Sequence, residues 1–546
     1  MTLTRCSSAA GDPRKRAALR STALTAIATA IPLALATACS SPSSGPAASS
    51  TTTTNATQGG TVTVGLPDAP DSLDPTTAST LVGRTVFANF CYKLYDIDSG
   101  LTIVPELAAA LPQVSPDGLT YTIQLKPNVK FNDGTPLTAQ AAVKTLNWYL
   151  TNPLSVRAPE LHGVQTVTAT GPLTVVIHLA KPFAPLTSIL ADRSGMILSQ
   201  TQLTKMGNNF AKDPVCVGPF QFSSRPSLDT IILTKSPYFY DKQDVHLSKV
   251  IFQVVSDPST MAADLESGEI QVADAVTPQN VSAIENNAQT AIQSQYSLGY
   301  QGLDFNVGNV HGSLNAPGVA NNPFAKYPAL RQAFEDTINR QQLNQVAFDG
   351  QYTPGCTPIP PNSPWAVSIT CPGQDIAQAK ALIKQTGLAT PVHVTLMVDN
   401  TPLSVQIGTI IQAMAKPAGF DVALQPTEFT TALTKAEDGN FEMFQIGWSG
   451  RIDPDQNIYS DWYPKSGLNY TGANYANLDT LLTQARESTD QTARHTLYHQ
   501  IVNVLENERN IIYLWYDKNI LGLRKNVTGV QFFADGLVRL ATASIG

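Results

Sequence analysis

Apolar and polar side chains alternate in several short segments of this chain. Over 119–125 and 173–179 every second residue is apolar, a period of two that predicts strands with one buried face. A run of Thr and Val over 61–66 predicts another strand, and the Pro- and Asp-rich stretch over 67–75 predicts turns after it. The folded part of the chain is therefore expected to begin near residue 60.

Other segments repeat their apolar residues at the spacing of a helix. Thr138 is expected to cap a helix over 139–150, whose apolar residues share one face. The same period predicts four later helices, over Ala329–Arg340, Asp375–Thr386, Leu478–Glu487 and Thr492–Asn507. Because strands and helices are interspersed, and because 38 Pro and 35 Gly favour turns, the pattern indicates a strand-rich α/β or α+β protein and excludes a helical bundle.

Length and composition add that the chain forms more than one packed unit. With 546 residues, 42% hydrophobic and 14% charged, it is too long for one ordinary domain and too apolar to be disordered. Its net charge is −7, and no block dense in Lys and Arg occurs beyond residue 20. A nucleic-acid-binding function is therefore not expected.

The first 38 residues have the organisation of an export signal. A basic cluster over 14–20 precedes an uncharged, mostly apolar stretch over 21–38. This stretch barely reaches the length of a membrane span and contains Pro32, which argues against a permanent transmembrane anchor. The small residues before Cys39 resemble the lipobox of bacterial lipoproteins, although Ala36 stands where Leu is usual. Residues 1–38 are thus the expected lipoprotein signal peptide, and Cys39 the lipidation site.

A Ser- and Thr-rich segment follows the leader. Residues 40–59 carry no charge and no large apolar side chain, so we expect a flexible tether over 39–58 that spans roughly 25 Å. Removal of the leader takes away five basic residues and one acid, which leaves 30 basic and 41 acidic residues and a net charge of −11. No later segment is long and apolar enough to span a bilayer, so the membrane is expected to be contacted only through lipid.

Four cysteines remain in the expected folded part. Cys356 and Cys371 bracket a Pro-rich loop, and closing this loop by a disulfide would stabilise an exported protein by roughly 3 kcal/mol. We expect this pair, which leaves Cys91 for Cys216, although four cysteines allow three connectivities. Zinc is the less favoured alternative, because these positions contain no CxxC and no neighbouring Cys and His.

Motifs for other chemistry are weak. His495 and His499 are one helical turn apart, but without an HExxH pattern they indicate a solvated face. The segments 96–100 and 453–457 are similar to the start of a calcium loop, but neither has the Glu at position twelve, so turns are expected. The chain contains no GxxxxGK[ST], GxGxxG or GxSxG motif. We expect no cofactor, no metal and no enzymatic activity, and the energy for any transport to come from a separate ATPase.

A series of blocks, in the same order, resembles one known family. These blocks cover 59–64, 71–75, 105–108, 117–123, 129–139, 214–220, 264–270, 330–334 and 446–448. From these blocks the chain is identified as a member of the family 5 extracellular solute-binding proteins, which serve peptide and nickel ABC importers. The resemblance covers about residues 59–546.

This resemblance implies an α/β, two-lobed periplasmic-binding-protein fold of class II (cluster C), with an extra domain inserted in the first lobe. Members bind solute in the cleft between the lobes, close by hinge motion and dock on a permease. Transferred to this sequence, the boundaries are lobe I at 59–88, 217–298 and 514–546, the inserted domain at 89–216, and lobe II at 299–513.

The resemblance also selects a loop as the main site candidate. In peptide-binding relatives the loop after the strand expected here at 441–446 lines the cleft, and an Asp three residues after the Trp pairs with the peptide's α-ammonium. Here Trp448 is followed at that position by Arg451, and Asp453 or Asp455 offers a replacement carboxylate. Arg451 suits a carboxylate or phosphate of the ligand, or alternatively pairs with Asp453 or Asp455 to hold the loop.

Further candidates have less support. Asn457 belongs to the same loop, and Trp448 either forms a wall of the cleft or packs under the loop. By position in the family, Asn306 after the expected crossover and Tyr92 near the start of the inserted domain are also candidate ligand-binding residues. Both equally suit buried, hydrogen-bonded structural roles.

The expected function is that of a lipid-anchored receptor at the outer face of the cytoplasmic membrane or in the periplasm. It would act as a monomer, capture short peptides or solutes of similar size, and deliver them to an ABC permease and its ATPase. The alternative is an envelope lipoprotein that uses the fold as a sensor or assembly factor. A hydrolase is not indicated, because the sequence arranges no nucleophile and base. Nickel complexes, haem, glutathione and oligosaccharides stay open as ligands.

Overall fold

Two large β-sheets organise residues 58–546, the part of the chain that the computed structural model describes. The expected signal peptide, the lipidation site Cys39 and the expected tether as far as residue 57 lie outside the described residues.

The first sheet has seven strands and forms lobe I. Its central strand β1 (Thr61–Leu66), predicted from the sequence, pairs in parallel with a neighbour on each side, and Val62 and Val64 are fully buried. The strand order is β12 (Thr290–Tyr296), β19 (Lys518–Arg524), β11 (Val272–Ala273), β1, β10 (Lys249–Val254), β9 (Thr230–Lys235) and β8 (Phe220–Ser227). The helices of this lobe are α1 (Leu81–Phe87), α5 (Pro258–Ser267) and α6 (Pro278–Asn286), and its C-terminal strand pairs are β20 (Val527–Thr528) with β23 (Ser544–Ile545) and β21 (Gln531–Phe532) with β22 (Val538–Arg539).

Between α1 and β8 the chain forms a separate four-stranded sheet, and we call the segment between Cys91 and Cys216 the inserted domain. The side chain of Thr138 accepts a hydrogen bond from the backbone N–H of Ala141 at 3.2 Å, so the predicted cap and helix are confirmed. The sheet order is β4 (Gln113–Val114), β5 (Thr120–Gln124), β7 (Thr174–Leu179) and β6 (Val164–Ala169), with helices α2 (Ala139–Thr151), α3 (Leu186–Ile189), η1 (Arg193–Gly195), α4 (Gln200–Met206) and η2 (Gly207–Lys212), and the pair β2 (Tyr95–Ile97) and β3 (Ile103–Pro105).

The second large sheet has six strands and forms lobe II. Successive side chains of strand β13 point to opposite faces of the sheet. Leu303 and Phe305 belong to one hydrophobic core and Tyr300 belongs to another. The strand order is β14 (Thr353–Pro354), β18 (Ile511–Tyr516), β13 (Tyr300–Phe305), β17 (Met443–Trp448), β15 (Val392–Asp399) and β16 (Phe420–Thr427). The helices are α7 (Pro323–Lys326), α8 (Ala329–Glu335), α9 (Arg340–Phe348), α10 (Ile376–Thr386), α11 (Pro402–Ala415), η3 (Lys416–Ala418), α12 (Phe429–Glu437), α13 (Asp455–Trp462), α14 (Ala476–Glu487) and α15 (Gln491–Glu508).

One helix prediction is wrong. The apolar period over 329–340 predicted a single helix, but α8 ends at Glu335 and α9 begins at Arg340. The side chain of Asn339 accepts a hydrogen bond from the N–H of Gln342 at 2.9 Å and so starts a new helix. The capping bond therefore overrides the apolar period at this point. The predicted helices over 375–386, 478–487 and 492–507 are confirmed.

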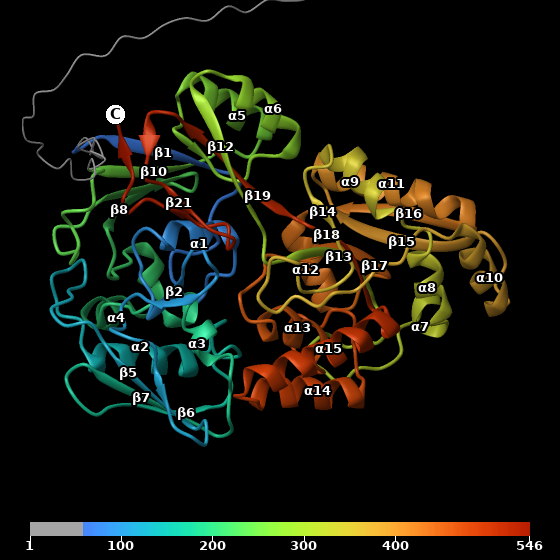
Figure 1. Ribbon diagram of the computed structural model, residues 1–546, viewed down its shortest axis with the longest axis horizontal. Coiled ribbons are helices and arrows are strands. Elements are labelled where there is room, and N and C mark those ends of the chain that lie inside the picture. The colour runs from blue at the N-terminus through green and yellow to red at the C-terminus, as the bar shows by residue number, and fades with distance from the viewer. Residues whose placement is uncertain (1–57) are drawn as a thin grey trace, which may run out of the picture. The chain divides into compact units, whose positions relative to one another are not determined.

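Two short crossings join the lobes. The chain passes from β12 to β13 through 297–299 and from β18 to β19 through Asp517, and Figure 1 shows β19 (red) leaving the first sheet toward β18. The N–H of Ser297 donates to the carbonyl of Asp517 at 2.9 Å, so the crossings are bonded to each other. Because β18 runs to Tyr516, the second crossing lies a few residues beyond the boundary placed after residue 513.

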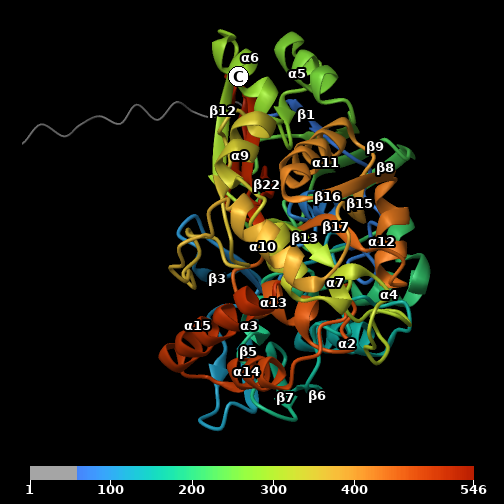
Figure 2. The same cartoon turned by 90° about the vertical axis from the view of Figure 1, so that its right-hand side faces the viewer.

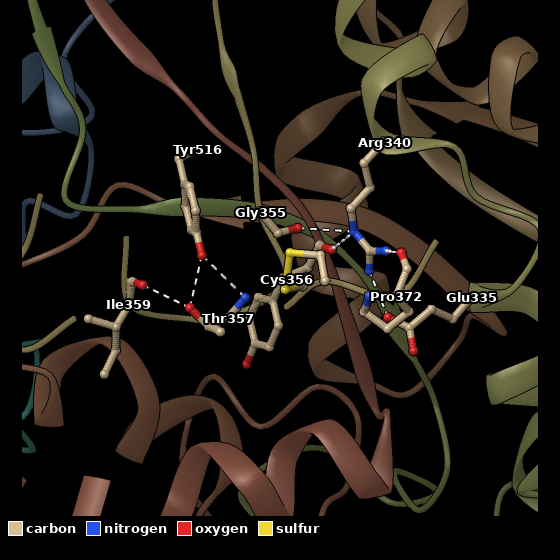
Figure 3. The surroundings of a disulfide bond; sticks show 10 residues. Glu335, Arg340, Gly355, Cys356, Thr357, Ile359, Pro372 and Tyr516 are labelled. Carbon is tan, nitrogen blue, oxygen red and sulfur yellow. Dashed lines mark hydrogen bonds and ion pairs between the residues drawn. A yellow bond between two sulfur atoms is a disulfide. The ribbon is translucent and has the colours of Figure 1, made fainter. Parts of the chain in front are cut away.

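The four cysteines among the described residues form two disulfides. Cys91–Cys216 joins the two ends of the inserted domain, and Cys356–Cys371 closes the Pro-rich loop. Figure 3 shows that Arg340 holds both ends of this loop, since it donates to the carbonyls of Gly355 and Pro372, each at 3.1 Å. The loop therefore depends on buried polar bonds as well as on the disulfide.

The same loop contacts the second crossing and the helices beneath it. The hydroxyl groups of Thr357 and Tyr516 are 2.8 Å apart, and Tyr516 is the last residue before the crossing. Trp365 of this loop stacks on His495, with ring centroids 4.5 Å apart. The predicted solvated face holds for His499, which is exposed, whereas His495 is half-buried because the Trp365 ring covers one side of its ring.

Candidate functional site

A small cavity lies where lobe I, the inserted domain and lobe II meet. Lobe I contributes Arg84 of α1, the inserted domain contributes Asp192, and lobe II contributes Arg451 from the loop after β17. The enclosed space is about 20 Å³, and it is about 310 Å³ when the open mouth is included. The remaining lining residues are Ile97, Ser188, Ala191, Leu298, Gly450, Ile452, Gln456 and Asp535.

The loop after β17 packs directly against the first crossing. Gly450 has a φ of +74° and forms a β-bridge with Leu298, and a Cβ at Gly450 would lie 2.1 Å from the carbonyl carbon of Leu298. A Cβ at Gly299 would lie 1.8 Å from the carbonyl oxygen of Trp448. Glycine is required at both positions, because the two backbones approach too closely for any side chain. The loop is thereby held beside the hinge.

Asn457 organises this loop from within. Its Oδ1 accepts from the backbone N–H of Arg451 at 2.7 Å and from Nε1 of Trp448 at 3.1 Å. Its Nδ2 donates to the carbonyls of Leu298 and Arg451. With 1% of its surface exposed, Asn457 has all its polar atoms engaged, so the structure gives it a structural role.

Arg451 pairs across the lobes. Its Nε lies 2.6 Å from Oδ2 of Asp192, and Oδ1 of Asp192 accepts from Nε of Arg84 at 3.0 Å. One carboxylate of the inserted domain thus bridges a guanidinium from each lobe. The sequence had offered Asp453 or Asp455 as the partners that hold Arg451, and the structure corrects this, because Asp192 takes that place.

The electrostatics of this bridge are those of a buried anion among cations. Burial alone raises the pKa of the Asp192 carboxyl, but the charges of Arg84, Arg451 and Arg193 outweigh it and hold the pKa well below its usual range. Burial, and then the charge of Arg84, lower the pKa of Arg451 to about 10. Both partners therefore stay charged at neutral pH.

Asp453 and Asp455 bind arginines of their own lobe. Nη1 and Nη2 of Arg494 on α15 each lie 2.9 Å from an oxygen of Asp453, and Arg486 on α14 binds Asp455 at 2.7 and 2.9 Å. These two-pronged pairs fix the start of α13. Both acids are therefore already paired with an arginine in this conformation. The sequence had suggested them as replacement carboxylates for binding an ammonium group of the ligand. Residues 453 and 454 form the turn that was expected, and α13 begins directly after it at Asp455.

The inserted domain also contacts lobe II through hydrogen bonds, at the cavity wall and beyond it. Ser188 donates to Oε1 of Gln456 at 2.7 Å, and the N–H of Ala184 donates to the carbonyl of Arg486 at 2.9 Å. At the surface, Nζ of Lys181 lies 2.9 Å from Glu487. Figures 1 and 2 both place α3 beside α13 and α14, so the lobes are engaged along this edge.

Asn306 and Tyr92 do not line the cavity. Asn306 is 2% exposed, and its Nδ2 donates to the carbonyls of Asn309 and Gly439, so it ties two loops together. Tyr92 packs edge-on against Phe239, with ring centroids 5.4 Å apart. Trp448 lies half-buried with the guanidinium carbon of Arg451 4.9 Å from its ring centroid, so it packs against the loop's own arginine.

Sequence reasoning missed Arg84, Asp192, Ser188 and Gln456. Arg84 had a usable signal, since it is a single charge within the apolar run 81–87. Within 58–546 no three His, Cys, Asp or Glu side chains gather so as to hold a metal ion. None of the helices in this range combines the length and apolarity needed to cross a membrane.

Comparison with known proteins gives a consistent family and fold. The family model described as bacterial extracellular solute-binding proteins, family 5 Middle, matches residues 102–470. The glutathione-binding protein GsiB of Pectobacterium atrosepticum is 26% identical over 494 residues, which cover 87% of this chain and 92% of the relative.

Solved structures show the same two-lobed periplasmic-binding-protein fold. The oligopeptide-binding protein AppA of Bacillus subtilis, in complex with a nonapeptide, superposes with a TM-score of 0.79 at 20% identity and covers 90% of this chain and 100% of its own. NikA of Staphylococcus aureus, in complex with Ni(L-His)2, superposes with a TM-score of 0.77 at 19% identity and covers 89% and 100%. One fold thus carries different ligands in different proteins.

Proposed function

The chain belongs to the bacterial extracellular solute-binding proteins, family 5, and we propose that it is the substrate-binding lipoprotein of an ABC importer. It captures a short peptide, or a solute of similar size, between its lobes and delivers it to a membrane permease that an ATPase drives. The observation that carries this proposal is the cavity to which both lobes and the inserted domain contribute charged side chains.

The arrangement of the two crossings supports the proposal. The crossings are short and bonded to each other, so one rotation there separates the lobes and parts Arg451 from Asp192. The cavity is small, so a solute of peptide size enters only when the lobes part. A solute then favours closure by as much as it binds the closed form more tightly than the open form.

The relatives support a peptide-like ligand. GsiB is named for glutathione, a tripeptide derivative, and AppA was solved with a nonapeptide. The chain carries Arg451 where peptide-binding relatives carry the Asp that pairs with an α-ammonium, so the ligand is anchored differently here.

The placement of the protein in the cell envelope follows from the same proposal. Cys39 carries the lipid, the segment after it tethers the receptor near the permease, and the protein works as a monomer at the outer face of the cytoplasmic membrane or in the periplasm. A Cys39→Ser variant tests the anchor: it should leave the membrane fraction and appear as soluble protein. Retention of the variant in the membrane would contradict a lipid anchor at Cys39.

Thermal unfolding of the mature protein tests the transport function. The ligand panel contains di- to pentapeptides, glutathione, haem, nickel chelates and oligosaccharides. A ligand at a hundred times its dissociation constant adds about 2.7 kcal/mol to the folded state, so its melting temperature should rise visibly. If no member of the panel raises the melting temperature, the sensor or assembly function becomes the better explanation.

A further inference from the structure

Four arginine side chains are buried around the inserted-domain wall of the cavity. Arg84, Arg157, Arg193 and Arg451 are each 3–8% exposed. Within the described residues, the carboxylates that form ion pairs with them are Asp192, shared by Arg84 and Arg451, and Glu160, which binds Arg157. These six side chains carry a net charge of +2.

Several nitrogens of this cluster lack an acceptor in the described part of the chain. They are Nη1 of Arg84 and Nε of both Arg157 and Arg193, all of them buried. Arg84 lines the cavity, and its Nε is already taken by Asp192. A buried guanidinium nitrogen without an acceptor is costly, because it has lost its water and gained nothing in return. Of these three arginines, Arg84 is the one that lines the cavity, and an anion bound beside it would supply its missing acceptor.

The titration of the arginines reflects the same excess of positive charge. Burial, and then the charge of Arg157, lower the pKa of Arg193 to about 9. Burial and Arg84 act in the same direction on Arg451. Each of these groups would be stabilised by a further negative charge nearby.

The acids at the cavity are all matched by arginines. Asp192 is held by Arg84 and Arg451, and Asp535 is held by Arg539 at 2.6 Å. The two acids of the neighbouring loop, Asp453 and Asp455, bind Arg494 and Arg486. An ammonium group entering the cavity would therefore find no carboxylate without a cationic partner.

We propose that the cavity is an anion site that anchors a carboxylate of the solute between Arg84 and Arg451, so that the substrate class is small peptides or peptide-like solutes of net negative charge. This inference rests on the proposed function and specifies its substrate. The donors for the solute, once the lobes part, are Nη1 of Arg84, which is buried here without an acceptor among residues 58–546, and Nη2 of Arg451, for which no hydrogen bond to the described residues is found. Planar guanidinium groups match a carboxylate in both charge and geometry.

Asp192 shows that a carboxylate fits between these two arginines, since it occupies part of that space itself. When the lobes part, Arg451 leaves with lobe II while Asp192 and Arg84 stay together. A solute carboxylate that bridges Arg84 and Arg451 would therefore favour the closed form. Arg84 and Arg451 would then select negatively charged solutes and also favour closure of the two lobes.

Matched dipeptides test the inference on the mature wild-type protein by calorimetric titration. Glu-Glu, Gln-Gln and Lys-Lys have the same backbone and similar side-chain lengths but differ in charge. We expect Glu-Glu to bind at least tenfold more tightly than Gln-Gln, Lys-Lys to bind more weakly still, and methyl esterification of Glu-Glu to remove the advantage. Affinity for Glu-Glu should fall as salt is added. Gln-Gln or Lys-Lys binding as tightly as Glu-Glu would overturn the inferred preference for solutes of net negative charge while leaving the transport function intact.

Two variants locate the effect in the cluster. Arg84→Gln removes one cavity guanidinium and should lower the ratio of Glu-Glu to Gln-Gln affinity by about tenfold. Arg331→Gln is the matched control, because Arg331 is equally buried but binds backbone carbonyls within lobe II. It should keep the ratio unchanged. An unchanged ratio in folded Arg84→Gln would overturn the inference. Failure of the wild-type protein to bind any member of the full ligand panel would overturn both this inference and the proposed function.

Discussion

The inserted-domain side of the cavity and the start of α13 use the same residue types in different proportions. At the start of α13 each acid has its own arginine, Asp453 with Arg494 and Asp455 with Arg486, and every pair is two-pronged. On the inserted-domain side four arginines share Asp192 and Glu160. Burial is similar on both sides, so the difference lies in the balance of charge.

This difference separates a structural network from one prepared for a ligand. A balanced, fully bonded pair gains nothing from an added ion, because its desolvation is already compensated. An unbalanced cluster retains an uncompensated charge that only another group can satisfy. Buried arginines therefore indicate a ligand-binding site where they outnumber the acids that pair with them. Burial alone does not indicate one.

Removing one acid from the pairs at the start of α13 should have the largest effect on the free energy of unfolding. Asp453→Asn leaves the guanidinium of Arg494 buried without its anion, which costs about 3–5 kcal/mol of the free energy of unfolding. Urea denaturation of the mature protein measures the loss. The control is Asp421→Asn, whose partner His393 is exposed with it, and which should change stability very little. A loss below 1 kcal/mol at Asp453 would show that the pair is not a structural element.

Removing one arginine from the inserted-domain side should lower the free energy of unfolding by less. Arg84→Gln removes a bond to Asp192, but it also lowers the net charge of the cluster from +2 to +1, and Asp192 keeps Arg451. We expect a loss of about 1–2 kcal/mol in the free energy of unfolding without ligand. Urea denaturation beside Asp453→Asn gives the direct comparison. Equal losses for the two variants would contradict the distinction between the two sides.

An acidic pair deeper in lobe II extends the comparison to excess negative charge. Burial raises the pKa of Asp461 to about 7, even though Tyr300 donates a hydrogen bond to it at 3.0 Å. Burial, and then the charge of Asp461, raise the pKa of Asp304 well above its usual range. A raised folded-state pKa favours the protonated acid, so its contribution to stability is fully present below about pH 4 and is lost as the pH rises through about 7.

Asp461→Asn should therefore stabilise the protein in alkaline solution. The amide keeps an acceptor for Tyr300 but cannot ionise, so the gain in the free energy of unfolding is on the order of 1 kcal/mol at pH 8 and close to zero at pH 4. Denaturation at both pH values measures it. A variant that is less stable than wild type at pH 8 would show that the ionised carboxylate contributes a favourable contact.

Local patterns in the sequence predicted the elements but not the site. The strand over 61–66 and the helix capped by Thr138 depend on neighbours in the chain, and both are confirmed. The break between α8 and α9 was missed because one cap at Asn339 outweighs an apolar period that continues through it. The spacing of apolar residues alone does not show whether a capping side chain will interrupt a helix.

The charged residues of the cavity could not be paired from the sequence for a different reason. Arg84, Asp192 and Arg451 come from three units whose contact is set by how the lobes pack, and no periodicity links them. Arg451 was found because it replaces an acid in a recognisable loop. Asp192 had no such context, so its bridging position emerges only from the fold.

The smallest effect is expected where the lobes meet in water. Lys181 and Glu487 form an ion pair across the lobes, but their side chains are 70% and 34% exposed, so solvent and salt screen it. Lys181→Ala should change the free energy of unfolding by less than about 0.5 kcal/mol and leave the affinity for the best peptide of the panel unchanged. Calorimetric titration at low salt is the most sensitive measurement, since screening is weakest there. A tenfold loss of affinity would mean that closure depends on this exposed pair, and that the buried bridge through Asp192 is not the dominant contact between the lobes.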